Sequence, residues 1–422
     1  MAKEKVRIDI PSSPFPFIPP LSELMGWING PAGLHTMLQR IQENDELPRV
    51  DPKTLRKAAR EGVTPRSAHR IMCNLEEAVR RRGIVDSLDW RANSEGLIPA
   101  NNGMKWVRFV PGLLAGVNRR RELKLELPRT LAYLVRRAQA EEDLLLLLHD
   151  VSAAGASTGD TRAAVKSGLA RALREHSLLA AAEVRASSDA ITFVVLGGVP
   201  NTYALAASLV KAALRLKVDF YHQLVANLMA DMLSIQDQLQ VPPRLAAVLE
   251  VHGAMGLLLP KTGTDKEDTP TYRLYEFWRE AFSGPDGPLI SYRSLARHLP
   301  QPRHERTRQL GPDLLDVADD TRLTRLKEWR AGTVPTSKQL TEFLESLTGG
   351  SYGALLPFLM SRVATAWTKW IAQEQMELAR LLEIDSRVGE HLQLDDFLQM
   401  FWEYPKYWQV AMAQAGEPQP GP

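Results

Sequence analysis

Lysine, arginine and threonine side chains gather in two short helical patterns of this sequence, and their chemistry is that of groups that bind anions. The first pattern covers residues 51–82, where nine basic and four acidic residues give a local net charge of +5. The second covers residues 321–347, where a basic helix precedes a Pro-started helix. Lys and Arg bind phosphate, Arg pairs with guanine through two hydrogen bonds, and a helix fits the major groove of DNA. These segments are the first candidates for a functional surface.

The segment at 321–347 combines the end of one helix with the start of another. Leu323, Leu326 and Trp329 share one face of the first helix, and Gly332 allows a left-handed cap after it. The second helix repeats apolar residues at helical spacing, namely Leu340, Phe343, Leu344 and Leu347. With their W-x-x-G-x-x-P spine, residues 313–347 resemble the lambda-repressor-like (Cro/cI-type, XRE) helix-turn-helix family. The resemblance implies that 321–330 is the recognition helix and that the helix following it starts after Pro335.

Residues 51–79 resemble the same half of that family. The matching positions are Leu55, Gly62 and Pro65, followed by Ala68, Ile71 and Leu75 as core residues. The segment departs from the pattern because one extra residue precedes Gly62 and because Ala58 stands where the family keeps a Trp. The family's two upstream helices are hard to locate in either segment; before the second, Ser291–Leu299 and Asp313–Ala318 are the candidates.

The resemblance assigns roles to polar side chains in both segments. A recognition helix presents polar side chains to base edges, while flanking cations and helix N-terminal amides hold phosphates. The residues expected to face bases are Lys53, Thr54, Lys57, Arg322, Thr324, Arg325 and Glu328. Those expected to contact phosphates are Arg56, Arg60, Arg66, Arg70, Lys327, Arg330, Thr336 and Lys338. The implied partner is double-stranded DNA. Two alternatives stay open, in which the segments are ordinary basic helices with solvated charges or units that dock protein.

The bulk composition narrows the class of protein. A chain of 422 residues with 44% hydrophobic and 24% charged residues is typical of a globular protein with more than one domain. The net charge of only +2 requires that any nucleic-acid surface be local. The single cysteine, Cys73, excludes an internal disulfide and fits a reducing cytoplasm. The sequence shows no secretory leader and no apolar run of membrane-spanning length, so we expect no membrane contact.

The periodicity of apolar residues predicts a mainly α fold with at most a small β element. Helices are expected at 21–28, 128–150, 161–183 with a break at 176–177, 202–217, 218–239, 244–258, 271–282, 355–384 and 392–400. The β-branched run at 190–196 predicts a strand, and 84–112 allows a hairpin. The predicted domains are a Pro-rich arm (1–20), helical domains at 21–95 and 96–285, the helix-turn-helix-like segment (286–350), and a C-terminal helical region with a disordered tail (351–422).

Several single residues are interpreted as structural. His222 and His252 lie in apolar surroundings and are expected to be hydrogen-bonded core residues, and Cys73 is expected in the core. Glu141 and Glu142 are interpreted as a pair on a helix surface. The aromatic residues of the C-terminal end are expected to be core, with an exposed partner-binding patch as the alternative; they are Phe401, Trp402, Tyr404, Tyr407 and Trp408.

The sequence therefore predicts a non-enzymatic DNA-binding protein, either a transcriptional regulator or the DNA-recognition subunit of a larger complex. The alternative is a helical scaffold or adaptor subunit, for instance in a phage-defence or mobile-element assembly, whose helix-turn-helix segments dock protein. A protein partner or a homo-oligomer is expected in both cases. Because the nine histidines are scattered and the acids form no catalytic cluster, we expect no enzymatic activity, no metal and no cofactor.

Overall fold

The structure is a computed structural model, and it describes the chain in segments. These are residues 17–28, 50–51, 53–54, 57–58, 63–71, 73, 102–103, 106–107, 109–111, 114, 118, 125–153, 158–196, 198, 200–241, 243–253, 255–260, 268–283, 288–300, 312–384 and 386–414. Within them the protein is mainly α-helical, as the sequence predicts, and no β-strand occurs among the elements described.

The elements follow one another as α-helices and two short 3-10 helices. They are α1 (Leu21–Trp27), α7 (Pro128–Ala153), α8 (Thr158–His176), α9 (Ala181–Val195), α10 (Tyr203–Ser234), α11 (Pro243–His252), η1 (Met255–Leu258), α12 (Pro270–Ala281), α13 (Tyr292–Arg297), α14 (Pro312–Arg330), α15 (Ser337–Thr348), α16 (Leu355–Ile384), η3 (Ser386–Glu390), α17 (Leu394–Trp402) and α18 (Tyr404–Ala413).

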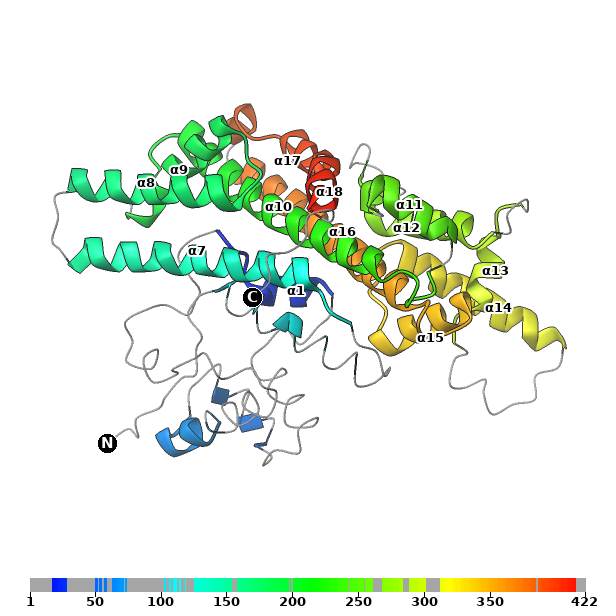
Figure 1. The fold of residues 1–422 in the computed structure, drawn as a ribbon. Helices are drawn as coiled ribbons and strands as arrows, with labels where there is room; N and C mark the ends of the chain where they lie inside the picture. The colour runs from blue at the N-terminus through cyan, green and yellow to red at the C-terminus, as the bar shows by residue number, and fades with distance from the viewer. Residues whose placement is uncertain are drawn as a thin grey trace.

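The long helix α10 is the centre of the arrangement. It packs against α7, α9, α17 and α18, so apolar side chains are buried around much of its circumference. Figure 1 shows α7, α8 and α9 toward one end of the molecule and α11 to α15 toward the other. The prediction of two helices at 202–217 and 218–239 is wrong, because α10 continues through 217–218. A helix that is apolar on all sides is one that other helices surround.

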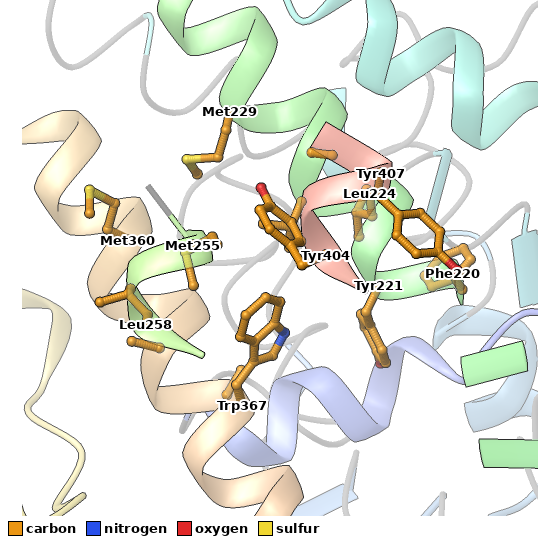
Figure 2. Packing of buried hydrophobic residues seen from close by; sticks show 14 of the residues in the cluster. Phe220, Tyr221, Leu224, Met229, Met255, Leu258, Met360, Trp367, Tyr404 and Tyr407 are labelled. Carbon is orange, nitrogen blue, oxygen red and sulfur yellow. The ribbon is translucent and has the colours of Figure 1, made fainter. Parts of the chain in front are cut away.

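Buried residues from segments far apart in sequence meet in one aromatic core. Figure 2 shows Tyr221 of α10, Met255 of η1, Trp367 of α16 and Tyr404 of α18 converging. The connected cluster of buried residues extends from Phe17 to Ala411 and includes members of every predicted domain. The predicted domain boundaries stay a prediction, but the described core is continuous across them.

The N-terminal arm and the C-terminal aromatic end both join this core. Phe17 is fully buried and Ile18 is 1% exposed, so the described end of the arm packs on the core. At the other end Tyr404 and Trp408 are buried as expected, whereas Trp402 is 44% exposed and donates its indole N–H to the carbonyl of Pro260.

The predicted strand at 190–196 is wrong, because these residues form the last turns of α9. That helix begins after Ala180, whose backbone N–H donates to Glu183 Oε2 at 2.7 Å. Ile191 and Thr192 are buried, and α9 packs on both α8 and α10. Tertiary packing thus outweighs the β propensity of the run AITFVVL. The sequence also allows a hairpin at 84–112, but the residues of this range that the structure describes, all within 102–111, are helical.

Candidate functional site

Helices α14 and α15 meet at a tight turn that the sequence predicts. Gly332 has φ +99°, and the N–H groups of Gly332 and Thr333 donate to the carbonyls of Trp329 and Glu328, each at 3.0 Å. This is the hydrogen-bond pattern of a Schellman cap, which needs a left-handed residue and so favours glycine. Trp329 is 3% exposed and packs edge-on against Phe343 of α15. The expected core of this segment is therefore confirmed.

Helix α14 is longer than the recognition helix that the resemblance implies. The predicted upstream helix Asp313–Ala318 and the basic residues after Thr321 belong to one continuous helix, Pro312–Arg330. The expectation that Asp313–Ala318 forms a separate helix is wrong, since the sequence between it and Thr321 contains no Gly or Pro to break the helix. Residues 321–325 consequently lie within a helix and not at its N-terminal end.

Arg330, an expected phosphate contact, is only 20% exposed and packs against other helices. Its guanidinium carbon is 4.3 Å from the ring centroid of Tyr272 and 4.2 Å from that of Tyr292. The Nη1 atom is also 3.9 Å from Glu276 Oε1. Two aromatic faces and a carboxylate are the usual partners of a structural arginine. Arg330 thus joins α14 to α12 and α13.

Arg322 and Arg325, which were expected to face bases, also contact the protein itself. Arg322 Nη1 lies 3.4 Å from Asp319 Oδ1, and its side chain is 14% exposed. Arg325 Nη1 donates to the carbonyl of Pro300 at 3.4 Å. Both interactions are long; the first lies within α14, and the second joins α14 to the chain that follows α13.

Acidic residues of α14 hold α13 against it. Arg293 Nη2 is 2.9 Å from Asp320 Oδ1, and Arg297 Nε is 2.9 Å from Asp319 Oδ2. Asp319 and Asp320 therefore lie on the side of α14 against which α13 packs.

The remaining candidates of this segment are exposed. Thr324, Lys327 and Glu328 are exposed on α14, and Thr336 and Lys338 are exposed at the start of α15. Thr336 is the N-cap: its Oγ1 accepts from the N–H of Gln339 at 3.2 Å. Lys338 is 75% exposed and lies 3.8 Å from Glu342, a weak surface pair. These side chains form the polar solvent face of the α14–α15 turn.

The N-terminal basic segment, residues 51–82, is described only in part. Lys53, Lys57, Arg66 and Arg70 are exposed and Thr54 is half-buried, while Arg56 and Arg60 lie outside the described residues. Ala68 and Ile71 are buried, as the resemblance implies. Cys73 is exposed, so its expected core position is wrong. Its Sγ lies 3.6 Å from Nε2 of His69, one helical turn earlier.

A buried ion pair that sequence reasoning missed ties the arm to α10. Arg137 and Asp219 are both fully buried, with Arg137 Nη1 3.1 Å from Asp219 Oδ2. Arg137 Nη2 donates to the carbonyl of Phe17 at 3.1 Å, and Asp219 Oδ1 accepts from Leu178 N–H at 2.9 Å and from Tyr407 O–H at 3.2 Å. The sequence signal that could have indicated this pair is a charged residue on the apolar face of each of the two helices, α7 and α10. The pair joins α7, α10 and α18 to the end of the arm, so its burial has a structural explanation.

Neither His222 nor His252 is the hydrogen-bonded core residue that the sequence predicts. His222 is buried, but neither ring nitrogen has a hydrogen-bond partner among the described residues. Burial, with a smaller contribution from the charge of Arg215, lowers the pKa of His222 to about 3. His252 is exposed, so the expected core position is wrong for it. The expected surface position of Glu141 is also wrong, because its side chain is fully buried and accepts a hydrogen bond from the Gly103 N–H at 2.8 Å.

Across the described ranges, His, Cys, Asp and Glu side chains form no group of three or more that is suited to a metal ion. None of the helices within those ranges combines the length and the apolar character that crossing a bilayer requires. Comparisons with protein-family models, with curated proteins and with solved structures found no match.

Proposed function

We propose that this protein is a non-enzymatic helical scaffold or adaptor subunit, and that its helix-turn-helix-like unit, α13 to α15, docks protein. The observation that carries the proposal is the use of the α14 arginines inside the chain. Arg330 lies between two tyrosine rings, and Arg322 and Arg325 contact Asp319 and the Pro300 carbonyl. Arg330, which is held between two rings, is not available to hold a phosphate, and Arg322 and Arg325 each have a partner within the protein.

The charge of α14 supports the same conclusion. The helix sequence PDLLDVADDTRLTRLKEWR carries five acidic and four basic residues, a net charge of −1. Affinity for DNA comes largely from neutralising phosphates with Lys and Arg. Over its whole length α14 carries more acids than bases, and α13 packs on the side that holds Asp319 and Asp320. Its solvent face carries Thr324, Lys327 and Glu328, which are all exposed.

The proposal is tested by copurification with the tagged full-length protein from nuclease-treated extract of its source cells. We expect a protein to copurify with the wild type and to be lost with a Lys327→Glu/Lys338→Glu variant. Lys369→Glu, which changes another exposed lysine on α16, is the matched control and should retain it. A partner that the double variant retains would refute docking at the α14–α15 turn. Loss of every copurifying protein on nuclease treatment would refute the scaffold function itself.

DNA binding is the second candidate, and the N-terminal basic segment favours it. Lys53, Lys57 and Arg66 are all exposed there, in a segment with a local net charge of +5. Cations in such an arrangement bind phosphates without reading sequence. If this segment binds DNA, a Lys53→Ala/Lys57→Ala/Arg66→Ala variant should lose affinity uniformly across sequences and show a shallower dependence on salt in fluorescence anisotropy. Equal binding by the variant and the wild type would exclude it.

A further inference from the structure

The last turns of α16 carry an exposed face that is apolar at its centre. Met376 is 49% exposed, and Ala372 and Ala379, which lie four residues before it and three residues after it, are exposed as well. The three side chains share one face of the helix, because positions three and four apart are neighbours on its surface. From Ala379 to Glu383 every consecutive residue is exposed. Helices in proteins gain most of their stability from packing, so a second helix on this face would stabilise the end of α16.

A hollow of about 380 Å³ lies beside this face, between α16 and the end of α1. Ala372 and Met376 line it from α16, and Gly26 and Trp27 line it from α1. A side chain at Gly26 would meet no other atom within 4 Å of its Cβ, so the space next to this residue is open. The distance between two packed helices depends on the side chains at their contact. Small residues and open space here therefore let another helix approach α16 closely.

Two charges of opposite sign flank the apolar centre at equal distances along the helix. Lys369 lies seven residues before Met376, and Glu383 lies seven residues after it. Seven residues are close to two helical turns, so both charges lie on the same face as Met376. Both side chains are exposed, and neither has a hydrogen-bond or ion-pair partner among the described residues. Because the two residues are about 21 Å apart along the helix axis, they cannot pair with each other within one chain.

A second copy of this helix matches the pattern when it lies antiparallel to the first. With a two-fold axis at Met376, the Lys369 side chain of each copy lies at the same height as Glu383 of the other copy. Ala372 then lies at nearly the same height as Ala379 of the other copy, which lets the two backbones come close. A two-fold interface uses the same surface patch on both subunits. A patch whose charges complement themselves in this way therefore favours a second copy over an unrelated partner.

We propose that this protein forms a two-fold homodimer in which the two α16 helices pack antiparallel about Met376. Lys369 of each copy pairs with Glu383 of the other copy. One helix face on each side is a small interface compared with the standard total of about 1,600 Å², so we expect a weak dimer with a Kd of about 1–100 µM. The interface is separate from the docking surface on α14 and α15, and it does not depend on the proposed scaffold function.

Sedimentation velocity of the full-length protein between about 1 and 200 µM tests the proposal. The wild type should change from monomer to dimer as its concentration rises. Met376→Glu should stay monomeric throughout, because it places two like charges at the two-fold axis. Val251→Glu, at a 67% exposed position of α11, is the matched control and should dimerise like the wild type. A wild type that remains monomeric at every concentration would overturn the proposal, as would a folded Met376→Glu variant that dimerises like the wild type.

Charge reversal tests the antiparallel pairing. Lys369→Glu should weaken the dimer by about fivefold or more, because two attractive ion pairs become repulsive. Lys369→Glu/Glu383→Lys exchanges the two charges and should restore the affinity of the wild type. Normal dimerisation of the single variant, or no recovery in the double variant, would overturn the pairing. The single variant should still copurify with a protein that docks on α14 and α15, so failure of the dimer and failure of the scaffold function are distinguishable.

Discussion

Replacing His222 with phenylalanine should stabilise the protein, and the effect should grow as the pH falls. The imidazole is fully buried, and its ring centroid lies 5.1 Å from that of Tyr407 and 5.5 Å from that of Tyr404. Neither ring nitrogen has a partner among the described residues, and an unsatisfied buried polar group destabilises a fold by about 1–3 kcal/mol. Phenylalanine removes this group. The slightly larger ring costs part of that gain through overpacking. At pH 7 we therefore expect the variant to be between about 0 and 2 kcal/mol more stable.

The pH dependence follows from linkage between protonation and folding. His222 has a folded-state pKa of about 3 and an ordinary value of 6.5, so the unfolded chain binds a proton that the folded protein excludes. Stability therefore falls as the pH drops below 6.5, by up to about 1.4 kcal/mol per pH unit. Between pH 7 and pH 5 the wild type loses about 2 kcal/mol of unfolding free energy in this way. The phenylalanine variant does not, because it has no imidazole to protonate.

Urea unfolding followed by tryptophan fluorescence measures this effect at both pH values. The free energy of unfolding of His222→Phe relative to the wild type should rise by about 2 kcal/mol from pH 7 to pH 5. A relative stability that does not change with pH would show that His222 is not held neutral. Destabilisation of the variant at pH 7 by more than about 2 kcal/mol would show that the imidazole makes a contact that phenylalanine cannot replace.

Three other substitutions test contacts that hold the fold. Asp219→Asn should lower the free energy of unfolding by about 3–5 kcal/mol, because it leaves the buried charge of Arg137 without its partner, and chemical denaturation would show this. Gly253→Ala should cost about 1–3 kcal/mol from its φ of +59° alone, and more because the new methyl group meets the indole of Trp408; the midpoint of thermal unfolding reports both effects. Arg330→Ala should cost about 1–2 kcal/mol through the loss of two cation–π contacts, measured as a shift in the urea midpoint without change in nucleic-acid binding.

Elements with strong local signals were predictable from the sequence. Helix α12 begins behind Thr269, whose side chain caps it, and Pro270 occupies its first position. The turn after α14 follows from Gly332, and the packing of Trp329 on Phe343 follows from their places on the apolar faces of two helices. In each case the residues that decide the structure are close together in the chain.

Features decided by distant partners were not predictable. The run at 190–196 has β propensity, but the neighbouring helices α8 and α10 bury it as part of α9. The candidate site shows the same effect. Nothing near Arg330 in the sequence indicates that Tyr272 and Tyr292 will cover its guanidinium. A basic helix that will bind DNA and one whose cations hold a protein together are alike until their neighbours in space are known.

The central claim, that α14 is part of a protein-docking unit and not a recognition helix, is tested most directly by fluorescence anisotropy with duplex DNA. The full-length wild type and a Thr324→Ala/Lys327→Ala variant would be titrated with random duplex across a salt series that begins at about 50 mM, where even non-specific contacts are favoured. Both residues are exposed, so the variant should fold normally. The account predicts that the two proteins give the same titration curves at every salt concentration. Tight binding with a steep salt dependence that the variant loses would contradict it.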